Sequence, residues 1–189
     1  MDTRKRSDSV VIRPAVVSDA SAIFHLVNTA YAVETGSEGI AFKCSNRLSS
    51  LSELDAVIAE HRCIAAFNTT GTLLGCIVYD IKKEQSECHF GPFAVDPSVQ
   101  GSGVGSSLMR SIDDVALAHD VKWISISVVN HRTDILPMYS ALGFVEYGTE
   151  PFPVDCIAEL TRPVTMILMR RRVRNSQSVP DLPLESQLT

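Results

Sequence analysis

The chain has 189 residues, of which 45% are hydrophobic, 21% charged and 6% aromatic, and this suits one globular domain with its own buried core. Its 17 Lys and Arg residues against 22 Asp and Glu residues give a formal net charge of −5. This balance argues against a nucleic-acid-binding or membrane-surface module, because both partners attract a basic surface.

The basic residues gather near the two ends of the sequence, at residues 4–6 and 170–174. Residues 7–169 carry only 10 basic against 19 acidic side chains. We expect the basic ends to lie in flexible or edge segments, so an anionic ligand has to be held by local devices in an acidic body. No apolar run approaches the roughly 20 residues that cross a bilayer, and residues 1–9 lack the apolar segment of a secretory signal. These features predict a soluble, cytoplasmic protein.

The five cysteines do not form a metal-binding or disulfide pattern. Their number is odd, they are scattered, and no C-x-x-C pair is present. Metal ligation or a disulfide framework favours paired spacings, so buried thiols and no metal are predicted. The residues concerned are Cys44, Cys63, Cys76, Cys88 and Cys156.

In chain order, the first half predicts a strand, two helices and a meander of three strands. The β-branched run at 10–13 is a strand, and Ser18 or Asp19 can cap a helix that continues to Tyr31. A second helix is expected at 52–60. The strands of the meander are expected at 63–67, 73–81 and 87–95, with a turn at 68–71.

The second half predicts alternating helices and strands. A Gly-rich stretch at 100–105 leads into a helix, and a strand follows at 123–129. Thr133 or Asp134 can cap a short helix that Gly143 ends, and further strands are expected at 144–147 and 164–169. The whole predicts one α/β (α+β) domain at 10–172, with a mixed sheet of about six or seven strands and about four helices. Residues 1–9 and 173–189 are expected to be disordered.

The stretch from Phe93 to Ser106 carries the chemistry, because a strand ends there, a loop turns through three glycines and a helix begins. Glycines let backbone N–H groups point inward, and a helix N-terminus adds unpaired donors, so the stretch predicts an anion seat. It is not a Rossmann fingerprint, because Ser106 stands where the last glycine belongs, and it lacks the lysine of a Walker A loop. The structural alternative is a loop that only lets helix and strand pack closely.

Two motifs together resemble the GCN5-related N-acetyltransferase (GNAT) superfamily. Gln100-Gly101-Ser102-Gly103-Val104-Gly105 is similar to its Q/R-x-x-G-x-G/A signature, and Tyr139-Ser140-Ala141-Leu142-Gly143-Phe144 is similar to its Y-x-x-x-G-F signature. The resemblance covers residues 10–171 and implies the GNAT fold, acetyl-CoA as co-substrate and no metal. It also implies which residues bind the pantetheine arm and the pyrophosphate: Phe93, Ala94, Val95, Gln100, Gly101, Ser102, Gly103, Val104, Gly105 and Ser106.

The resemblance makes Tyr139 the candidate acid that protonates the CoA sulfur, and the alternative is a core tyrosine. In several family members a carboxylate stands six residues before the position of Val95, and His89 occupies that place here. A histidine suits a general base, since its ordinary pKa is about 6.5. Glu87, Glu34 or a water chain are the alternatives. His89 shares a strand face with Phe93 and Val95 unless a bulge at 91–92 intervenes.

The remaining candidate site residues are less specific. Asn130 follows a strand where the family often has an asparagine facing the cofactor, and Arg132 stands where the usual spacing would place it. Both can instead belong to a polar loop that caps the next helix. Acceptor binding is expected from the early helices and the segment after Gly143. The candidates there are Tyr31, Glu34, Glu38, Phe42, Glu150 and Phe152.

The sequence therefore predicts an acetyl-CoA-dependent N-acetyltransferase that acts on a primary amine of a small molecule or a peptide. The alternative is a non-catalytic acyl-CoA-binding or protein-interaction module with the same fold. Transfer to histone tails has little support, since neither a reader domain nor a basic surface is evident. A homodimer through the last strand or through residues 150–163 stays open.

Overall fold

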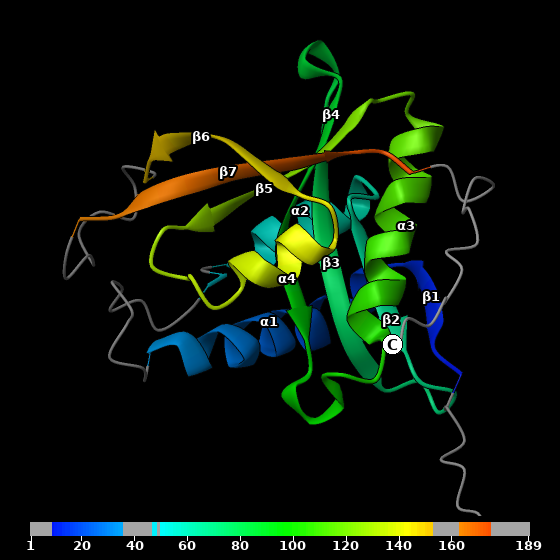
Figure 1. Ribbon diagram of the computed structural model, residues 1–189. Coiled ribbons are helices and arrows are strands. Elements are labelled where there is room, and N and C mark those ends of the chain that lie inside the picture. Colours follow the sequence, from blue (N-terminus) through cyan, green and yellow to red (C-terminus); the bar gives the residue numbers. More distant parts are fainter. Residues whose placement is uncertain (1–8, 36–46, 49, 153–162, 175–189) are drawn as a thin grey trace, which may run out of the picture.

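The computed structural model describes residues 9–35, 47–48, 50–152 and 163–174, and they form a seven-stranded mixed sheet flanked by helices (Figure 1). The strands follow the order β1-β2-β3-β4-β5-β7-β6 across the sheet. Their bounds are β1 Val11–Pro14, β2 Cys63–Phe67, β3 Leu73–Lys82, β4 Glu87–Val95, β5 Trp123–Val129, β6 Val145–Pro151 and β7 Thr165–Arg172. The α-helices in these ranges are α1 Ala20–Thr35, α2 Leu51–Ala59, α3 Val104–Ala118 and α4 Leu136–Ala141.

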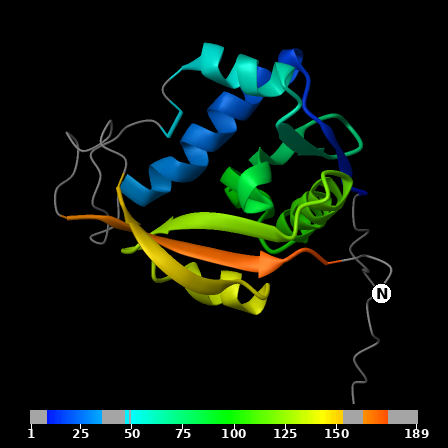
Figure 2. The same cartoon turned by 90° about the horizontal axis from the view of Figure 1, so that it is seen from above.

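Two apolar clusters hold the layers together. On one face of the sheet, Ile23 and Val27 of α1 pack with Leu54 and Ile58 of α2. On the other face, the buried side of α3 packs against β3, β4 and β5. Figure 2 shows α1 and α2 at one side of the molecule and β5, β7, β6 and α4 at the opposite side. The expected mixed α/β architecture is confirmed, and no helix in the described ranges is long and apolar enough to cross a membrane.

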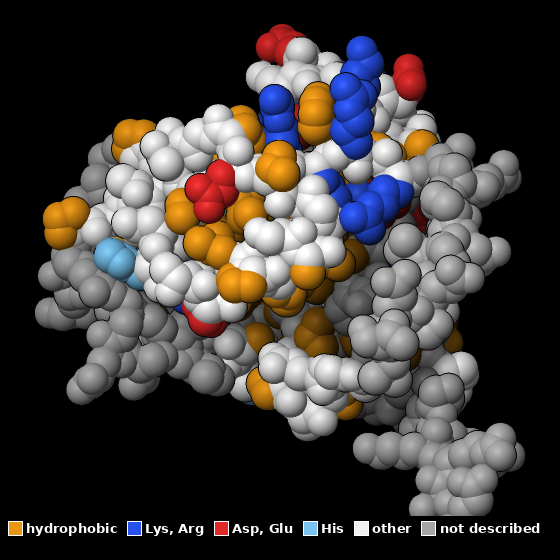
Figure 3. Space-filling model, viewed as in Figure 1, with side chains coloured by type: hydrophobic (Ala, Val, Ile, Leu, Met, Phe, Trp, Pro, Cys, Tyr) orange, Lys and Arg blue, Asp and Glu red, His pale blue; other side chains and the backbone are white. Residues whose placement is uncertain are grey.

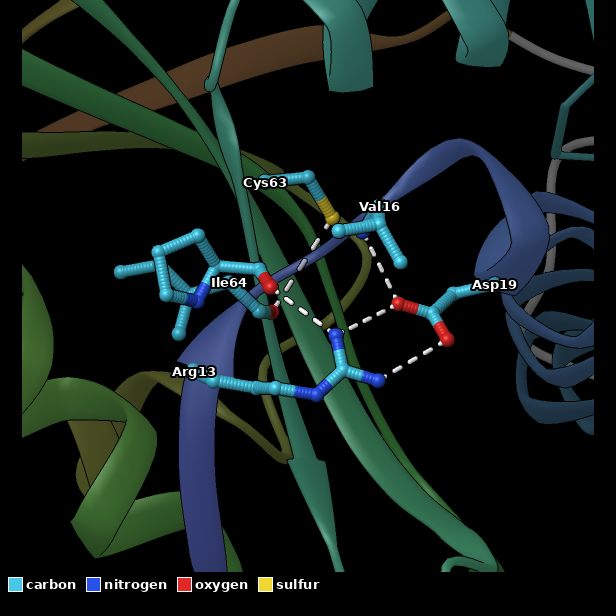
Figure 4. A network of polar contacts seen from close by, with 6 residues as sticks. Arg13, Val16, Asp19, Cys63 and Ile64 are labelled. Atoms are coloured by element: carbon cyan, nitrogen blue, oxygen red, sulfur yellow. Dashed lines mark hydrogen bonds and ion pairs between the residues drawn. The ribbon is translucent and has the colours of Figure 1, made fainter.

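The start of α1 differs from the expected cap. A 3₁₀ turn at Val17–Asp19 precedes the helix, and the Asp19 carboxylate accepts a hydrogen bond from the Val16 N–H at 2.9 Å. Arg13 of β1 donates to both oxygens of this carboxylate, at 2.7 and 3.0 Å (Figure 4). This ion pair and hydrogen bond lower the pKa of Asp19. The carboxylate therefore fastens β1 to the turn before α1 instead of capping the helix.

The thiols within the described ranges are free and buried, as predicted. Cys63, Cys76 and Cys88 lie in the core. Burial raises the pKa of the Cys63 and Cys88 thiols to about 12, so both stay protonated and unreactive. Cys44 and Cys156 lie outside the described residues.

Helix α4 also begins without the expected cap. Asp134 is paired with Arg132 (Nε to Oδ1, 2.9 Å), and no side chain caps the first turn. Its end does follow the prediction: Gly143 has φ +87°, and its N–H donates to the Ser140 carbonyl at 2.9 Å. Such a left-handed residue directly after a helix favours glycine.

The expectation that the basic C-terminal end is a flexible or edge segment is wrong. Strand β7 lies inside the sheet between β5 and β6. Arg171 is 5% exposed and donates to both oxygens of Asp113 of α3, at 2.6 and 2.8 Å. Both edges of β7 are paired, so the last strand offers no free edge to which a strand of a second copy could add.

Candidate active site

The site is a gap between two neighbouring parallel strands. Strands β4 and β5 pair only at Glu87–Trp123, Cys88–Ile124 and His89–Ser125. Beyond these pairs β5 turns away from β4, as Figure 1 shows, and the rest of each strand lacks the other as a partner. A sheet opened in this way exposes backbone N–H and C=O groups that an extended ligand can pair with.

A bulge in β4 determines which side chains beside the gap point to each face of the sheet. Two residue steps on β3, from Ile77 to Tyr79, oppose three steps on β4, from Phe90 to Phe93. Phe90 and Phe93 consequently both pack on the α3 side, although they are separated by an odd number of positions. His89, the neighbour of Phe90, lies on the opposite face. The expected shared face of His89 and Phe93 is thus broken by the bulge at 91–92.

The backbone groups of β4 that face the gap form only weak hydrogen bonds. The Phe93 carbonyl accepts from the Tyr31 hydroxyl, and the Val95 carbonyl accepts from the Gln100 side-chain amide, both at 3.4 Å. Both bonds are long for hydrogen bonds, so a ligand can displace them at small cost. The resemblance placed the pantetheine arm at this stretch, and its backbone groups are open to such pairing.

The glycine loop at the end of the gap has the features of an anion seat. Gly101 and Gly103 have φ values of +78° and +93°, and α3 begins directly after Gly103. Asp96 steadies the loop by accepting from the Ser98 N–H at 2.8 Å. Within the described ranges, no hydrogen bond is formed by the backbone N–H groups of Gly101, Gly103, Val104, Gly105 and Ser106. These donors at a helix start suit phosphate.

No basic side chain of the loop itself contributes to the anion seat, because residues 96–106 contain no Lys or Arg. The seat lies at the lower end of α3 in Figure 1. The Lys and Arg side chains on the same view gather at the opposite, upper end, over the hairpin between β3 and β4 and the end of β7 (Figure 3). The loop therefore offers an anion backbone dipoles and no basic side chain of its own.

Tyr139 of α4 packs against β4 on the α3 side of the sheet. It is 4% exposed, and its ring packs on Phe90 and Phe144 with centroids 6.2 and 5.7 Å apart. Burial raises the pKa of its phenol well above the usual value, and the nearby Tyr31 adds to this rise. A phenol that keeps its proton is suited to donate it to a developing thiolate.

His89 stands where the two strands part, and it has a polar partner that the sequence did not reveal. Its Nδ1 lies 2.9 Å from Ser125 Oγ, and Ser125 Oγ donates to Glu87 Oε1 at 2.5 Å. Burial lowers the pKa of His89, which favours the neutral ring that a base needs. Ser125 was missed because it looks like an ordinary strand residue, and only the pairing of β4 with β5 places it beside His89.

The structure separates the other candidates from one another. Asn130 turns its side chain to the Thr165 N–H at 3.3 Å, which joins the end of β5 to the start of β7. Arg132 is held by Asp134. Phe152 is half-buried after β6. Glu38, Phe42 and the Glu34 side chain lie outside the described residues, and no group of His, Cys, Asp or Glu in the described part of the chain is arranged to hold a metal ion.

Comparison with known proteins gives one family match. The model of the acetyltransferase (GNAT) family matches residues 29–144. The uncharacterized protein YdhI of Bacillus subtilis is 22% identical over 131 residues, which is 69% of this chain and 74% of that protein.

Solved structures share the fold at low identity. The ribosomal-protein-S18-alanine N-acetyltransferase of Escherichia coli has a TM-score of 0.66 at 17% identity, covering 93% of this chain and 100% of that one. An N-acetyltransferase of Staphylococcus aureus Mu50 has a TM-score of 0.65 at 15% identity, covering 88% and 99%. Salmonella typhimurium yncA, solved with its cofactor acetyl-CoA, has a TM-score of 0.65 at 16% identity, covering 93% and 99%. At such identities the likeness shows the shared fold.

Proposed function

Because the chain belongs to the acetyltransferase (GNAT) family, we propose that it transfers the acetyl group of acetyl-CoA to a primary amine of a small molecule or a peptide. The observation that carries this proposal is the continuous path from the free amides at the start of α3, along the open backbone of β4, to His89. The path begins with donors for a pyrophosphate and ends beside a neutral imidazole. These are the groups that a thioester donor and an ammonium acceptor need.

In this proposal the residues of the gap bind, orient and move protons. The amides of Gly101 and of Gly103 to Ser106 bind the pyrophosphate, and the backbone of Phe93 and Val95 orients the pantetheine arm. His89 Nε2 takes a proton from the acceptor ammonium. The neutral amine then attacks the thioester carbonyl carbon, so that a C–N bond forms and the C–S bond breaks.

Tyr139 completes the proton balance of the proposed reaction. Its phenol gives a proton to the departing sulfur and regains one from the nitrogen that has become an amide. His89 returns its proton to solvent, so each turnover releases one proton overall. Since only neutral His89 acts and burial lowers its pKa, kcat/KM is expected to fall on the acid side, with a midpoint below about 6.5.

The test measures thiol release from acetyl-CoA against a panel of polyamines, amino acids, aryl amines, aminoglycosides and peptides. Turnover with at least one acceptor is expected, and Tyr139→Phe should lower kcat with little change in the KM for acetyl-CoA. Tyr147→Phe, an exposed tyrosine of β6, is the matched control and should leave kcat unchanged. Tight binding of acetyl-CoA by calorimetry without turnover on any acceptor would favour the non-catalytic acyl-CoA-binding module instead.

A further inference from the structure

A short chain of hydrogen bonds leads from a buried carboxylate to His89. Glu87 is 7% exposed and Ser125 is 1% exposed. Ser125 Oγ lies 2.5 Å from Glu87 Oε1 and 2.9 Å from His89 Nδ1, so it bridges the two. The bridge follows from the parallel pairing, which sets Ser125 of β5 opposite His89 of β4.

The number of protons available fixes the direction of these bonds. A carboxylate only accepts, so the single hydroxyl proton of Ser125 is committed to Glu87. The Ser125 oxygen can then only accept from His89, which requires the proton of the neutral ring to sit on Nδ1. The free lone pair is left on Nε2, and in the described part of the chain the His89 ring forms its one hydrogen bond through Nδ1.

We propose that Glu87 and Ser125 are positioning residues that hold His89 in the Nδ1–H tautomer and stabilise the ring once Nε2 has accepted a proton. This inference rests on the proposed function, in which His89 is the base. No proton moves along the chain of bonds: the ring keeps Nδ1–H, Ser125 keeps its hydroxyl proton, and only Nε2 gains and loses one. Glu87 is therefore not the base itself, since it is buried behind Ser125.

Several charges surround His89, and they set the expected effect of removing one. Burial lowers the pKa of His89, and the Lys82 ammonium lowers it further. The carboxylates of Glu87, Glu150 and Asp80 act in the opposite direction. Loss of the Glu87 charge must therefore lower the pKa of His89 still more.

The same sheet face offers a matched control. Ser127 lies two residues after Ser125 on β5 and so points to the same side. Its Oγ lies 3.2 Å from Glu150 Oε1, which makes a second serine–glutamate pair that does not contact His89. Ser127→Ala removes the same atom as Ser125→Ala and leaves the bond to His89 in place.

The first experiment reads the tautomer directly, by nitrogen-15 NMR of the full chain with the His89 signals identified from His89→Gln. We expect a protonated Nδ1 and an unprotonated Nε2, unchanged in Ser127→Ala. Ser125→Ala should shift the ring toward the Nε2–H form, and Ser125→Thr, which keeps a hydroxyl, should restore Nδ1–H. A proton on Nε2 in the unaltered protein, or an unchanged tautomer in Ser125→Ala, overturns the inference.

The second experiment reads the charge. Glu87→Gln still accepts from Ser125 but carries no charge, so the tautomer should persist while the pKa of His89 falls by about one unit. The acid limb of kcat/KM should move down with it, and the KM for acetyl-CoA should stay the same. The inference is contradicted if Glu87→Gln changes neither the acid limb of kcat/KM nor the pKa of His89 in the NMR titration. Full turnover in His89→Gln would instead contradict the proposed function, in which His89 is the base. The NMR experiment would still decide whether Ser125 fixes the tautomer of His89.

Discussion

The two halves of the gap are built from different parts of the polypeptide. At the glycine loop the donors are the backbone N–H groups of Gly101 and of Gly103 to Ser106. At the other end the groups are side chains of Glu87, His89 and Ser125, brought together from two strands. A site made of backbone should tolerate the loss of side chains but not added ones, whereas a site made of side chains should depend on each of them.

The largest expected effect is at the side-chain half. His89→Ala removes the proposed base, so kcat/KM should fall by about 10²–10⁴-fold, which is the usual contribution of general base catalysis. The KM for acetyl-CoA should stay constant, because the loop amides are untouched. Steady-state kinetics of His89→Ala and of His119→Ala, an exposed histidine after α3, make the comparison. Equal activity in the two variants would remove His89 from the mechanism.

The difference also explains how far the sequence could predict the molecule. The bounds of β2, β4 and β5 are as expected, because apolar runs bounded by turn residues define them locally. The glycine loop is likewise local, so its motif was readable. The partnership of Ser125 with His89 was not, since it depends on strand pairing across 36 positions of sequence.

The wrong helix caps have a related cause. Asp19 and Asp134 are good capping residues by type, but each is bound by an arginine instead. Arg13 lies on a strand, and Arg132 lies two residues before Asp134 in a loop whose shape the sequence does not fix. The position of β7 inside the sheet was missed for the same reason. Local sequence patterns predict strands but not the order in which β5, β7 and β6 lie side by side.

The second prediction concerns a methyl group added to β3, beside the start of α3 and so next to the glycine loop. A Cβ on Gly75 of β3 would lie 3.0 Å from the Ala94 carbonyl oxygen and 3.1 Å from Leu108 Cδ1. Both neighbours are buried, so Gly75→Ala should lower the free energy of unfolding by about 1–3 kcal/mol. It should also weaken acetyl-CoA binding, because the start of α3 must shift away from β3.

Urea unfolding measures the first effect and calorimetry measures the second. Gly148→Ala is the control, since its Cβ would meet only Leu168 Cδ1 at 3.8 Å, an ordinary contact. Unchanged stability in Gly75→Ala would show that α3 is not held as closely to β3 as the structure indicates.

The third prediction separates backbone strain from loss of the ligand site. Gly101 and Gly71 have φ values of +78° and +83°, and a Cβ at either meets no protein atom within 4 Å. Each alanine variant should therefore lose a similar stability, about 1 kcal/mol, through the left-handed backbone. Only Gly101→Ala places its methyl group at the anion seat, so only it should weaken CoA binding, by about five- to tenfold. Equal CoA affinity in both variants would place the pyrophosphate elsewhere.

The smallest expected effect is the most direct test of a backbone-built seat. Gln100→Ala removes a side chain of the motif, yet that side chain makes only a 3.4 Å bond to the Val95 carbonyl. Its loss breaks no contact that the loop amides need, and it frees a carbonyl that faces the gap. CoA affinity should thus change by less than about threefold, within the worth of one exposed hydrogen bond. A tenfold loss measured by calorimetry would mean that the glutamine side chain binds the cofactor itself, and the contrast between the two halves of the site would no longer hold.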